Sequence, residues 1–163
     1  MKERLLLLIA SLFFLSSFGQ TGNLKNLENS KGFEQFIYGT SIKKYQNFKL
    51  RPTTEVFQEY VSTIPINYKD VKIDSVELFF FKERLYAINL YIDESERTKM
   101  TTELEKLYGL QSSLLRTENE SIWNGKVIKL SIGSVGNNQH SVHFENTENQ
   151  DEREKESIDQ LMK

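Results

Sequence analysis

The segment from Val76 to Ile92, which reads VELFFFKERLYAINLYI, most constrains the fold of this chain. Two apolar runs flank the charged residues Lys82, Glu83 and Arg84, a pattern typical of two β-strands joined by a tight turn. Side chains alternate between the two faces of a strand, so the length of the loop decides which side chains share a face. We expect a loop of three or five residues, because an odd number produces one wholly apolar face.

That apolar face is expected in the core. It comprises the residues Val76, Leu78, Phe80, Tyr86, Ile88, Leu90 and Ile92. An even-numbered loop would instead bring Asn89 and Tyr91 into the core, where an unpaired amide costs about 1–3 kcal/mol. The opposite face carries the residues Glu77, Phe79, Phe81, Leu85, Ala87, Asn89 and Tyr91. This second face is too aromatic to meet only water, because each exposed large apolar side chain forgoes about 1.5–3 kcal/mol of burial.

A short helix is predicted for residues 41–48, ahead of this hairpin. Ser41 is a suitable N-cap, and Ile42, Tyr45 and Phe48 follow at helical spacing.

A second helix is predicted for residues 95–108, after the hairpin. Met100, Leu104 and Leu107 line one helix face, and Gly109 follows as the terminating residue.

Further strands are indicated by β-branched and aromatic residues. They cover residues 33–38, 57–63, 114–123 and 126–132, and a last strand with Val142 and Phe144 facing inward. Asn124 and Gly125 are the strongest signal for a two-residue type I′ turn. Such a turn would place Trp123 opposite Lys126, on the same face as Ile128.

These elements predict an α+β fold in a single domain. Helix 41–48 precedes three strands, helix 95–108 precedes three more, and the pattern repeats after roughly fifty residues. We therefore expect two helix-strand-strand-strand modules that form one antiparallel sheet with two helices packed on one face. The domain would span residues 33–145, between a flexible leader at residues 20–32 and a charged, disordered tail at residues 146–163.

The N-terminus has the pattern of a secretory signal peptide. Lys2 and Arg4 precede an apolar run over residues 5–15, and small residues follow up to Gly19. We expect cleavage of residues 1–19 and export to the periplasm or the medium. The run is shorter than the roughly 20 residues that a membrane span needs, although an uncleaved signal anchor stays an alternative.

Composition excludes several kinds of site. The chain contains no cysteine, so disulfides, a lipid-anchored cysteine and cysteine-ligated metals are excluded. The net charge is −2, and cleavage would make it −3 because residues 1–19 carry two cations and one anion. Such a balance argues against a nucleic-acid partner, which requires a basic surface.

The residues that could carry chemistry do not form a recognisable site. His140 and His143 lie three apart on a strand, so they face opposite sides of the sheet and cannot share one metal ion without a bulge. Glu118 and Glu120 share a face and could pair as carboxylates, but a charged solvent face is a far commoner arrangement. No serine stands in a G-x-S-x-G turn or an S-x-x-K motif. We therefore predict no catalytic, cofactor-binding or metal-binding residue.

Four local patterns together resemble a known class of protein. They are Phe36 to Ser41 before a short helix, the Phe80 to Leu85 hairpin, Leu107 to Gly109, and Trp123 to Gly125 ahead of a strand. In this combination the chain resembles small exported bacterial proteins of the β-lactamase-inhibitor-protein-like class, which have tandem helix and sheet modules, over residues 33–145. The resemblance implies protein binding through the sheet and no catalysis. The chain lacks the lipid-anchored cysteine of the related outer-membrane-assembly lipoproteins.

Two functional hypotheses follow. The first is an exported, non-enzymatic module that binds a protein, peptide or envelope ligand through the second hairpin face, with the binding residues Phe79, Phe81, Leu85 and Tyr91. The alternative is a metal-dependent or hydrolytic envelope enzyme that uses Glu118, Glu120 and His140. The alternative to a binding surface is that residues 20–32, the tail or a curled sheet covers the aromatic face.

Overall fold

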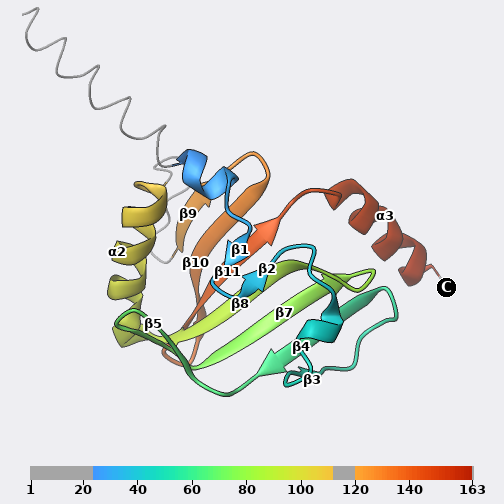
Figure 1. Cartoon of the computed structure of the whole chain (residues 1–163), viewed down its shortest axis with the longest axis horizontal. Coiled ribbons are helices and arrows are strands. Elements are labelled where there is room, and N and C mark those ends of the chain that lie inside the picture. The colour runs from blue at the N-terminus through green and yellow to red at the C-terminus, as the bar shows by residue number, and fades with distance from the viewer. Residues whose placement is uncertain (1–23, 112–119, 163) are drawn as a thin grey trace, which may run out of the picture.

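An antiparallel sheet is the framework of the computed structural model, which describes residues 24–111 and 120–162 (Figure 1). Within these residues the main sheet has seven strands. In spatial order they are β3 (Lys49–Leu50), β4 (Phe57–Ser62), β7 (Ser75–Phe81), β8 (Arg84–Asp93), β11 (Gln139–Asn146), β10 (Ile128–Gly136) and β9 (Glu120–Asn124). The two longest hairpins therefore meet where β8 pairs with β11.

Smaller elements surround the sheet. Two short hairpins are β1 (Gly32–Phe33) with β2 (Phe36–Ile37), and β5 (Ile66–Tyr68) with β6 (Val71–Ile73). The helical elements are the 3-10 turns η1 (Ile42–Lys44) and η2 (Glu94–Glu96), and the helices α2 (Arg97–Tyr108) and α3 (Gln150–Leu161). Residues 24–28 are also helical.

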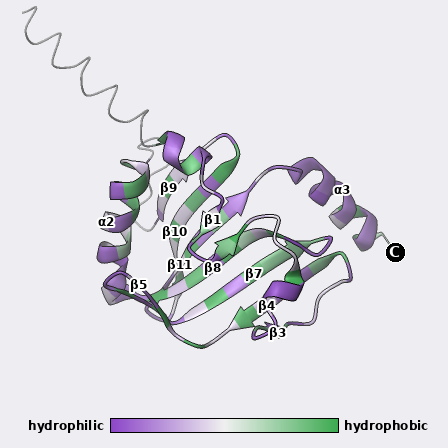
Figure 2. Ribbon diagram, viewed as in Figure 1, coloured by the Kyte–Doolittle hydropathy of each residue, from purple (hydrophilic) through white to green (hydrophobic). Residues whose placement is uncertain are grey.

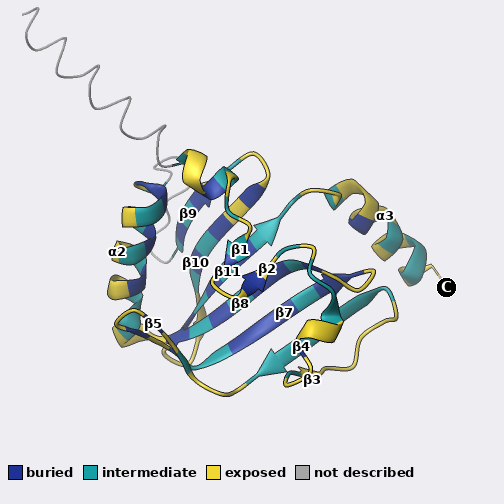
Figure 3. Cartoon of the chain, in the orientation of Figure 1, coloured by how far each residue is buried: buried dark blue, intermediate teal, exposed yellow. Residues whose placement is uncertain are grey.

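The hydrophobic core lies on one side of the sheet, which we call the inner face, and the opposite side is the outer face. Ten side chains of the inner face are fully buried: Val76, Leu78, Phe80, Ile88, Leu90, Ile92, Leu130, Ile132, Val142 and Phe144. Figures 2 and 3 show these apolar, buried positions along the central strands. Helix α2, the β5–β6 hairpin and the N-terminal segment 24–48 add further core residues, including Met100, Leu104, Ile73, Leu27 and Phe36.

The central hairpin confirms the predicted apolar face but not the predicted loop. Only Lys82 and Glu83 separate β7 from β8, both with positive φ angles, of 47° and 62°. A β-bulge restores the register, because Phe79 pairs with Ala87 while Phe80 pairs with Leu85, which leaves Tyr86 as the extra residue. The bulge sends Leu85 into the core and Tyr86 toward the outer face, so the predicted faces of these two residues are wrong.

The β9–β10 connection also differs from the prediction. Trp123 pairs with Leu130 instead of Lys126, so Asn124 and Gly125 do not form a two-residue turn. Trp123 is nevertheless on the predicted inner face and fully buried. The carboxylate of Glu28 explains the wider loop, since it accepts hydrogen bonds from the backbone N–H groups of Lys126 and Val127.

The predicted fold of two helix-strand-strand-strand modules with two packed helices is wrong. The described chain is mostly β-structure, and the first predicted helix, residues 41–48, contains only the 3-10 turn η1. Over eight residues helix propagation gains little against the cost of nucleation, so tertiary packing decides the local structure. Tyr45 and Phe48 instead pack as an aromatic pair, with ring centroids 6.1 Å apart.

The second predicted helix is confirmed as α2, in which Met100 and Leu104 are fully buried.

Both ends of the described chain are more ordered than their composition predicts. Residues 24–28 of the predicted flexible leader are helical, and Leu27 is fully buried. The predicted disordered tail contains the 12-residue helix α3. Within residues 24–111 and 120–162, no helix is long and apolar enough to cross a membrane. The predicted signal peptide lies outside the described residues.

Candidate functional site

The candidate site is the outer face of the sheet, where strand alternation brings polar and aromatic side chains together. From β4, β7, β8 and β11 it presents the residues Phe57, Glu59, Val61, Glu77, Phe79, Phe81, Ala87, Asn89, Tyr91, Ser141, His143 and Glu145. The bulge adds Tyr86, whose ring centroid lies 6.5 Å from that of Phe79.

Three of the four predicted binding residues lie on the outer face. Phe79 and Tyr91 are half-buried there. Phe81 is only 8% exposed, because it packs against Phe57 with ring centroids 5.2 Å apart. Leu85 does not belong to the site, since the bulge places it in the core at 2% exposure.

A buried carboxylate, that of Glu77, lies at the middle of the outer face and is only 4% exposed. One of its oxygens accepts hydrogen bonds from the hydroxyl of Tyr91 at 2.6 Å and from the side-chain amide of Asn89 at 3.4 Å. The other lies 2.7 Å from the guanidinium of Arg51, which also pairs with Glu59 at 2.6 Å. Burial and the hydrogen bond to Glu77 raise the pKa of Tyr91 to about 12. The carboxylate is therefore matched by donors on several sides, as a buried charge requires.

The same row of hydrogen bonds continues toward the other half of the sheet. The side-chain oxygen of Asn89 lies 2.5 Å from Nδ1 of His143, and Nε2 of His143 lies 3.9 Å from the carboxylate of Glu145. Glu145 pairs with Arg153 of α3 at 3.0 Å. Hydrogen bonding to His143, together with the charges of His143 and Arg153, lowers the pKa of Glu145 against the opposing effect of its burial.

We call this connected set the polar row. Its members are Glu59, Arg51, Glu77, Tyr91, Asn89, His143, Glu145 and Arg153. The row crosses strands β4, β7, β8 and β11 and ends at α3. Sequence reasoning placed Glu77, Asn89 and Tyr91 on one face from their alternation. It missed Arg51 and Arg153, because both come from segments outside the predicted sheet.

Arg153 attaches α3 to the end of the outer face. This guanidinium is buried, and its carbon lies 4.4 Å from the ring centroid of Tyr86. It also donates to the backbone carbonyls of Glu148 at 2.8 Å and Asn146 at 3.1 Å. The charged and aromatic partners on all sides explain how an arginine can be buried at this position.

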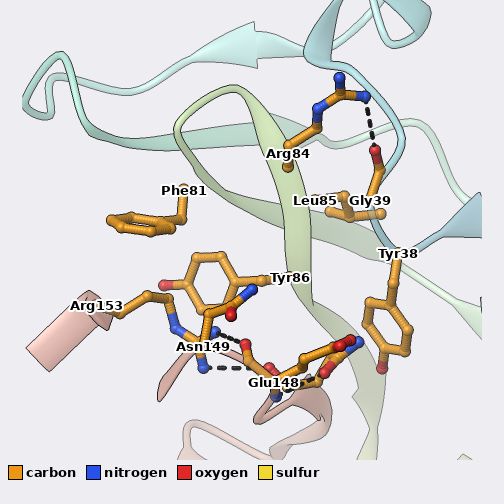
Figure 4. Close-up of a pocket in the computed structure, with 10 residues that line it drawn as sticks. Tyr38, Gly39, Phe81, Arg84, Leu85, Tyr86, Glu148, Asn149 and Arg153 are labelled. Carbon is orange, nitrogen blue, oxygen red and sulfur yellow. Dashed lines mark hydrogen bonds between the residues drawn. The ribbon is translucent and has the colours of Figure 1, made fainter. Parts of the chain in front are cut away.

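A pocket of about 380 Å³, which we call the end pocket, lies beside this attachment (Figure 4). Three segments enclose it: the β2–η1 turn, the end of the β7–β8 hairpin and the segment before α3. Aromatic rings of Tyr38, Phe81 and Tyr86 line it together with Glu148. The hydroxyl of Tyr38 is buried and has no hydrogen-bond partner among the described residues, and burial raises the pKa of Tyr38.

The residues of the enzyme alternative do not come together. Glu118 lies outside the described residues, and Glu120 pairs with Gly133 on the outer face. His140 lies on the inner face at 2% exposure, where its Nε2 bonds to Glu94, so Glu120 and His140 point to opposite sides of the sheet. The predicted opposite orientation of His140 and His143 is confirmed. Among residues 24–111 and 120–162, no three acidic or histidine side chains form a group that could hold a metal ion.

The chain matches no protein-family model, and comparisons with curated proteins and with solved structures find no match. The resemblance to the β-lactamase-inhibitor-protein-like class stays a prediction from local patterns.

Proposed function

We propose that this protein is an exported, non-enzymatic binding module that contacts a partner protein through its outer sheet face. The observation that carries the proposal is the polar row, in which charged groups are already fixed in place before any partner arrives. Fixed donors and acceptors lose little conformational entropy on binding, which favours affinity.

The residues in and beside the polar row suit a protein partner better than a small ligand. Phe79 and Tyr91 offer half-buried aromatic surface, and the side chain of Arg51 is 49% exposed. Aromatic residues and arginine are the side chains most enriched in the energetically dominant parts of protein interfaces. The outer face spreads them over several strands, as an extended contact requires.

Export is the second part of the proposal, and the N-terminal sequence supports it. The basic residues, the apolar run over residues 5–15 and the small residues before Gln20 are the features that export machinery reads. The absence of cysteine suits either an oxidising or a reducing compartment.

Site-specific photo-crosslinking in the producing cell tests the binding proposal. A photoreactive amino acid at Phe79 should give a discrete crosslinked adduct, and the same group at Leu110 should not. Leu110 is a matched control because it is 61% exposed and apolar but follows α2 outside the outer face. Crosslinking should weaken when Arg51→Ala is added to the Phe79 variant. Equal adducts from both positions, or none from Phe79, would contradict an interface on the outer face.

A further inference from the structure

The end pocket is a second candidate site, distinct from the middle of the outer face. Its volume of about 380 Å³ falls within the range of small-molecule sites, and its three enclosing segments come from distant parts of the chain. The segment before α3 is held in place by the Arg153 hydrogen bonds to Glu148 and Asn146. This wall of the pocket is therefore attached to α3 without a ligand.

The aromatic walls of the pocket already interact with cations. The guanidinium of Arg153 lies 4.4 Å from the Tyr86 ring centroid, and the ammonium of Lys82 lies 5.1 Å from the Phe81 ring centroid. An aromatic face attracts a cation through the negative potential above its ring plane. A pocket with several such rings in its walls favours a positively charged ligand with an apolar body.

The unneutralised charge that faces the pocket is negative. Arg153 is paired with Glu145 at 3.0 Å, so its charge is balanced. Arg84 donates to the backbone carbonyl of Gly39 at 3.1 Å, and Figure 4 shows its guanidinium turned away from Tyr38 and Glu148. The carboxylate of Glu148 has no hydrogen bond or ion pair with any residue that the structure describes, and it is exposed.

The hydroxyl of Tyr38 adds an unsatisfied polar group at the same end of the pocket. A buried hydroxyl without a partner is unfavourable, because it has lost its hydrogen bonds to water. Tyr38 and Glu148 also line a neighbouring hollow of about 310 Å³, so the two groups lie at the boundary between two cavities. Of the two groups the Glu148 carboxylate is the accessible one, because the Tyr38 hydroxyl is buried.

We propose that the end pocket binds a small organic cation, a protonated amine that carries an aromatic or other apolar body. The ammonium group pairs with the Glu148 carboxylate, and the apolar body lies against the rings of Phe81 and Tyr86. This inference does not rest on the proposed protein partner, because it concerns other residues and a different class of ligand.

Titration of the purified protein with three matched probes tests the charge preference. Phenethylammonium, 2-phenylethanol and 3-phenylpropanoate share a phenyl ring but are cationic, neutral and anionic at neutral pH. Protein-detected NMR should show saturable shifts with phenethylammonium, centred on residues of the end pocket, and at least tenfold weaker binding of the other two. Binding of all three with similar affinity, binding elsewhere, or no binding of the cation at 10 mM would overturn the proposal.

Two variants separate a specific ion pair from general attraction to an acidic protein. Glu148→Gln should weaken phenethylammonium binding roughly ten- to hundredfold, because a charge-assisted hydrogen bond is lost. Asp151→Asn removes the same charge from an exposed position at the start of α3 and should leave the affinity within about twofold. Equal losses in the two variants, or no loss in Glu148→Gln, would refute the assigned role of Glu148.

Discussion

At the scale of single residues, Glu77 illustrates what a sequence can and cannot predict about a site. Alternation along a strand places Glu77 on the same face as Asn89 and Tyr91, and the structure confirms this arrangement. Alternation cannot predict that Arg51, which directly follows the edge strand β3, reaches the other carboxylate oxygen at 2.7 Å. Contacts of this kind depend on a loop path that no periodic pattern encodes.

The hydrogen bond from Tyr91 to the buried Glu77 carboxylate should contribute measurably to stability. We expect Tyr91→Phe to lower the free energy of unfolding by about 1.5–3 kcal/mol, because a charged acceptor loses its shortest donor. Chemical denaturation followed by tryptophan fluorescence, with Trp123 buried in the core, measures this change. The control is Tyr60→Phe, whose hydroxyl makes no hydrogen bond with the described residues and whose loss should change stability by less than about 0.5 kcal/mol. Equal effects of the two substitutions would contradict the assigned bond.

Glu145 should make the stability of the protein depend on pH in the acid range. Its folded-state pKa is lower than the ordinary value of 4.5, through hydrogen bonding to His143 and the charges of His143 and Arg153. A lowered folded-state pKa means that the stabilisation is fully present above about pH 4.5 and is lost as the pH falls through the folded value. The difference in unfolding free energy between the native protein and Glu145→Gln should therefore shrink as the pH falls from about 5.5 to 3. A constant difference over that range would show that the carboxylate is not stabilised in the fold.

At the scale of elements, the central hairpin shows why a correct face can accompany a wrong loop. The apolar face was predictable because burial requires Val76 and Leu78 to share a side with Ile88 and Leu90. A two-residue loop is incompatible with that face in a regular hairpin, but the bulge at Tyr86 supplies the missing residue. A bulge inside a strand leaves no composition signal here, so its consequence for Leu85 could not be foreseen.

Helix α3 is the opposite case, because its composition predicts disorder but the segment is helical in the structure. One residue, Arg153, attaches this helix to the sheet. Most of the helix is charged, and of its described residues only Arg153 is buried. Burial of a long charged side chain is rare in general, so a sequence pattern gives it no weight. Lys82 of the hairpin turn adds an ion pair to Glu152 at 2.5 Å.

Removal of the Arg153 guanidinium should release α3 from the sheet. We expect Arg153→Met to lower the free energy of unfolding by about 1–3 kcal/mol, because Glu145 and two backbone carbonyls lose their donor. Amide hydrogen exchange should become faster across residues 150–161 while the strands stay protected. The control is Lys155→Met, an exposed cation of the same helix, which should leave both measurements nearly unchanged. Slow exchange in α3 of the Arg153 variant would mean that other contacts hold the helix.

At the scale of the whole molecule, the N-terminal segment 24–48 covers the inner face of the sheet, where the sequence predicts a helix at residues 41–48. Leu27, Phe33, Phe36 and Tyr45 from this segment belong to the hydrophobic core. The segment consists of a helical turn, two-residue strands and one 3-10 turn, which are too short to produce a periodic pattern. Sequence analysis could therefore predict that the inner face needs a cover but not what the cover is.

Truncation of Leu27 should destabilise the whole domain. We expect Leu27→Ala to lower the free energy of unfolding by about 2–5 kcal/mol, because a fully buried side chain leaves a cavity. Thermal unfolding should stay a single transition with a lower Tm. The comparison variant Leu50→Ala removes the same atoms from a side chain that is 56% exposed and should cost less than about 0.5 kcal/mol. A similar small effect of both would mean that residues 24–28 are not part of the cooperative unit.

The pairing of β8 with β11 in the middle of the sheet has a consequence for how the chain reaches its native state. The β7–β8 and β10–β11 hairpins join neighbours in sequence, whereas β8 and β11 lie roughly fifty residues apart along the chain. Non-local pairings of this kind slow a folding reaction, because the chain loses conformational entropy before the paired strands gain stabilising contacts. Pairing of β8 in the first hairpin with β11 in the second is therefore expected to limit the folding rate. Until these two strands pair, each hairpin presents an unpaired strand edge to any other chain nearby.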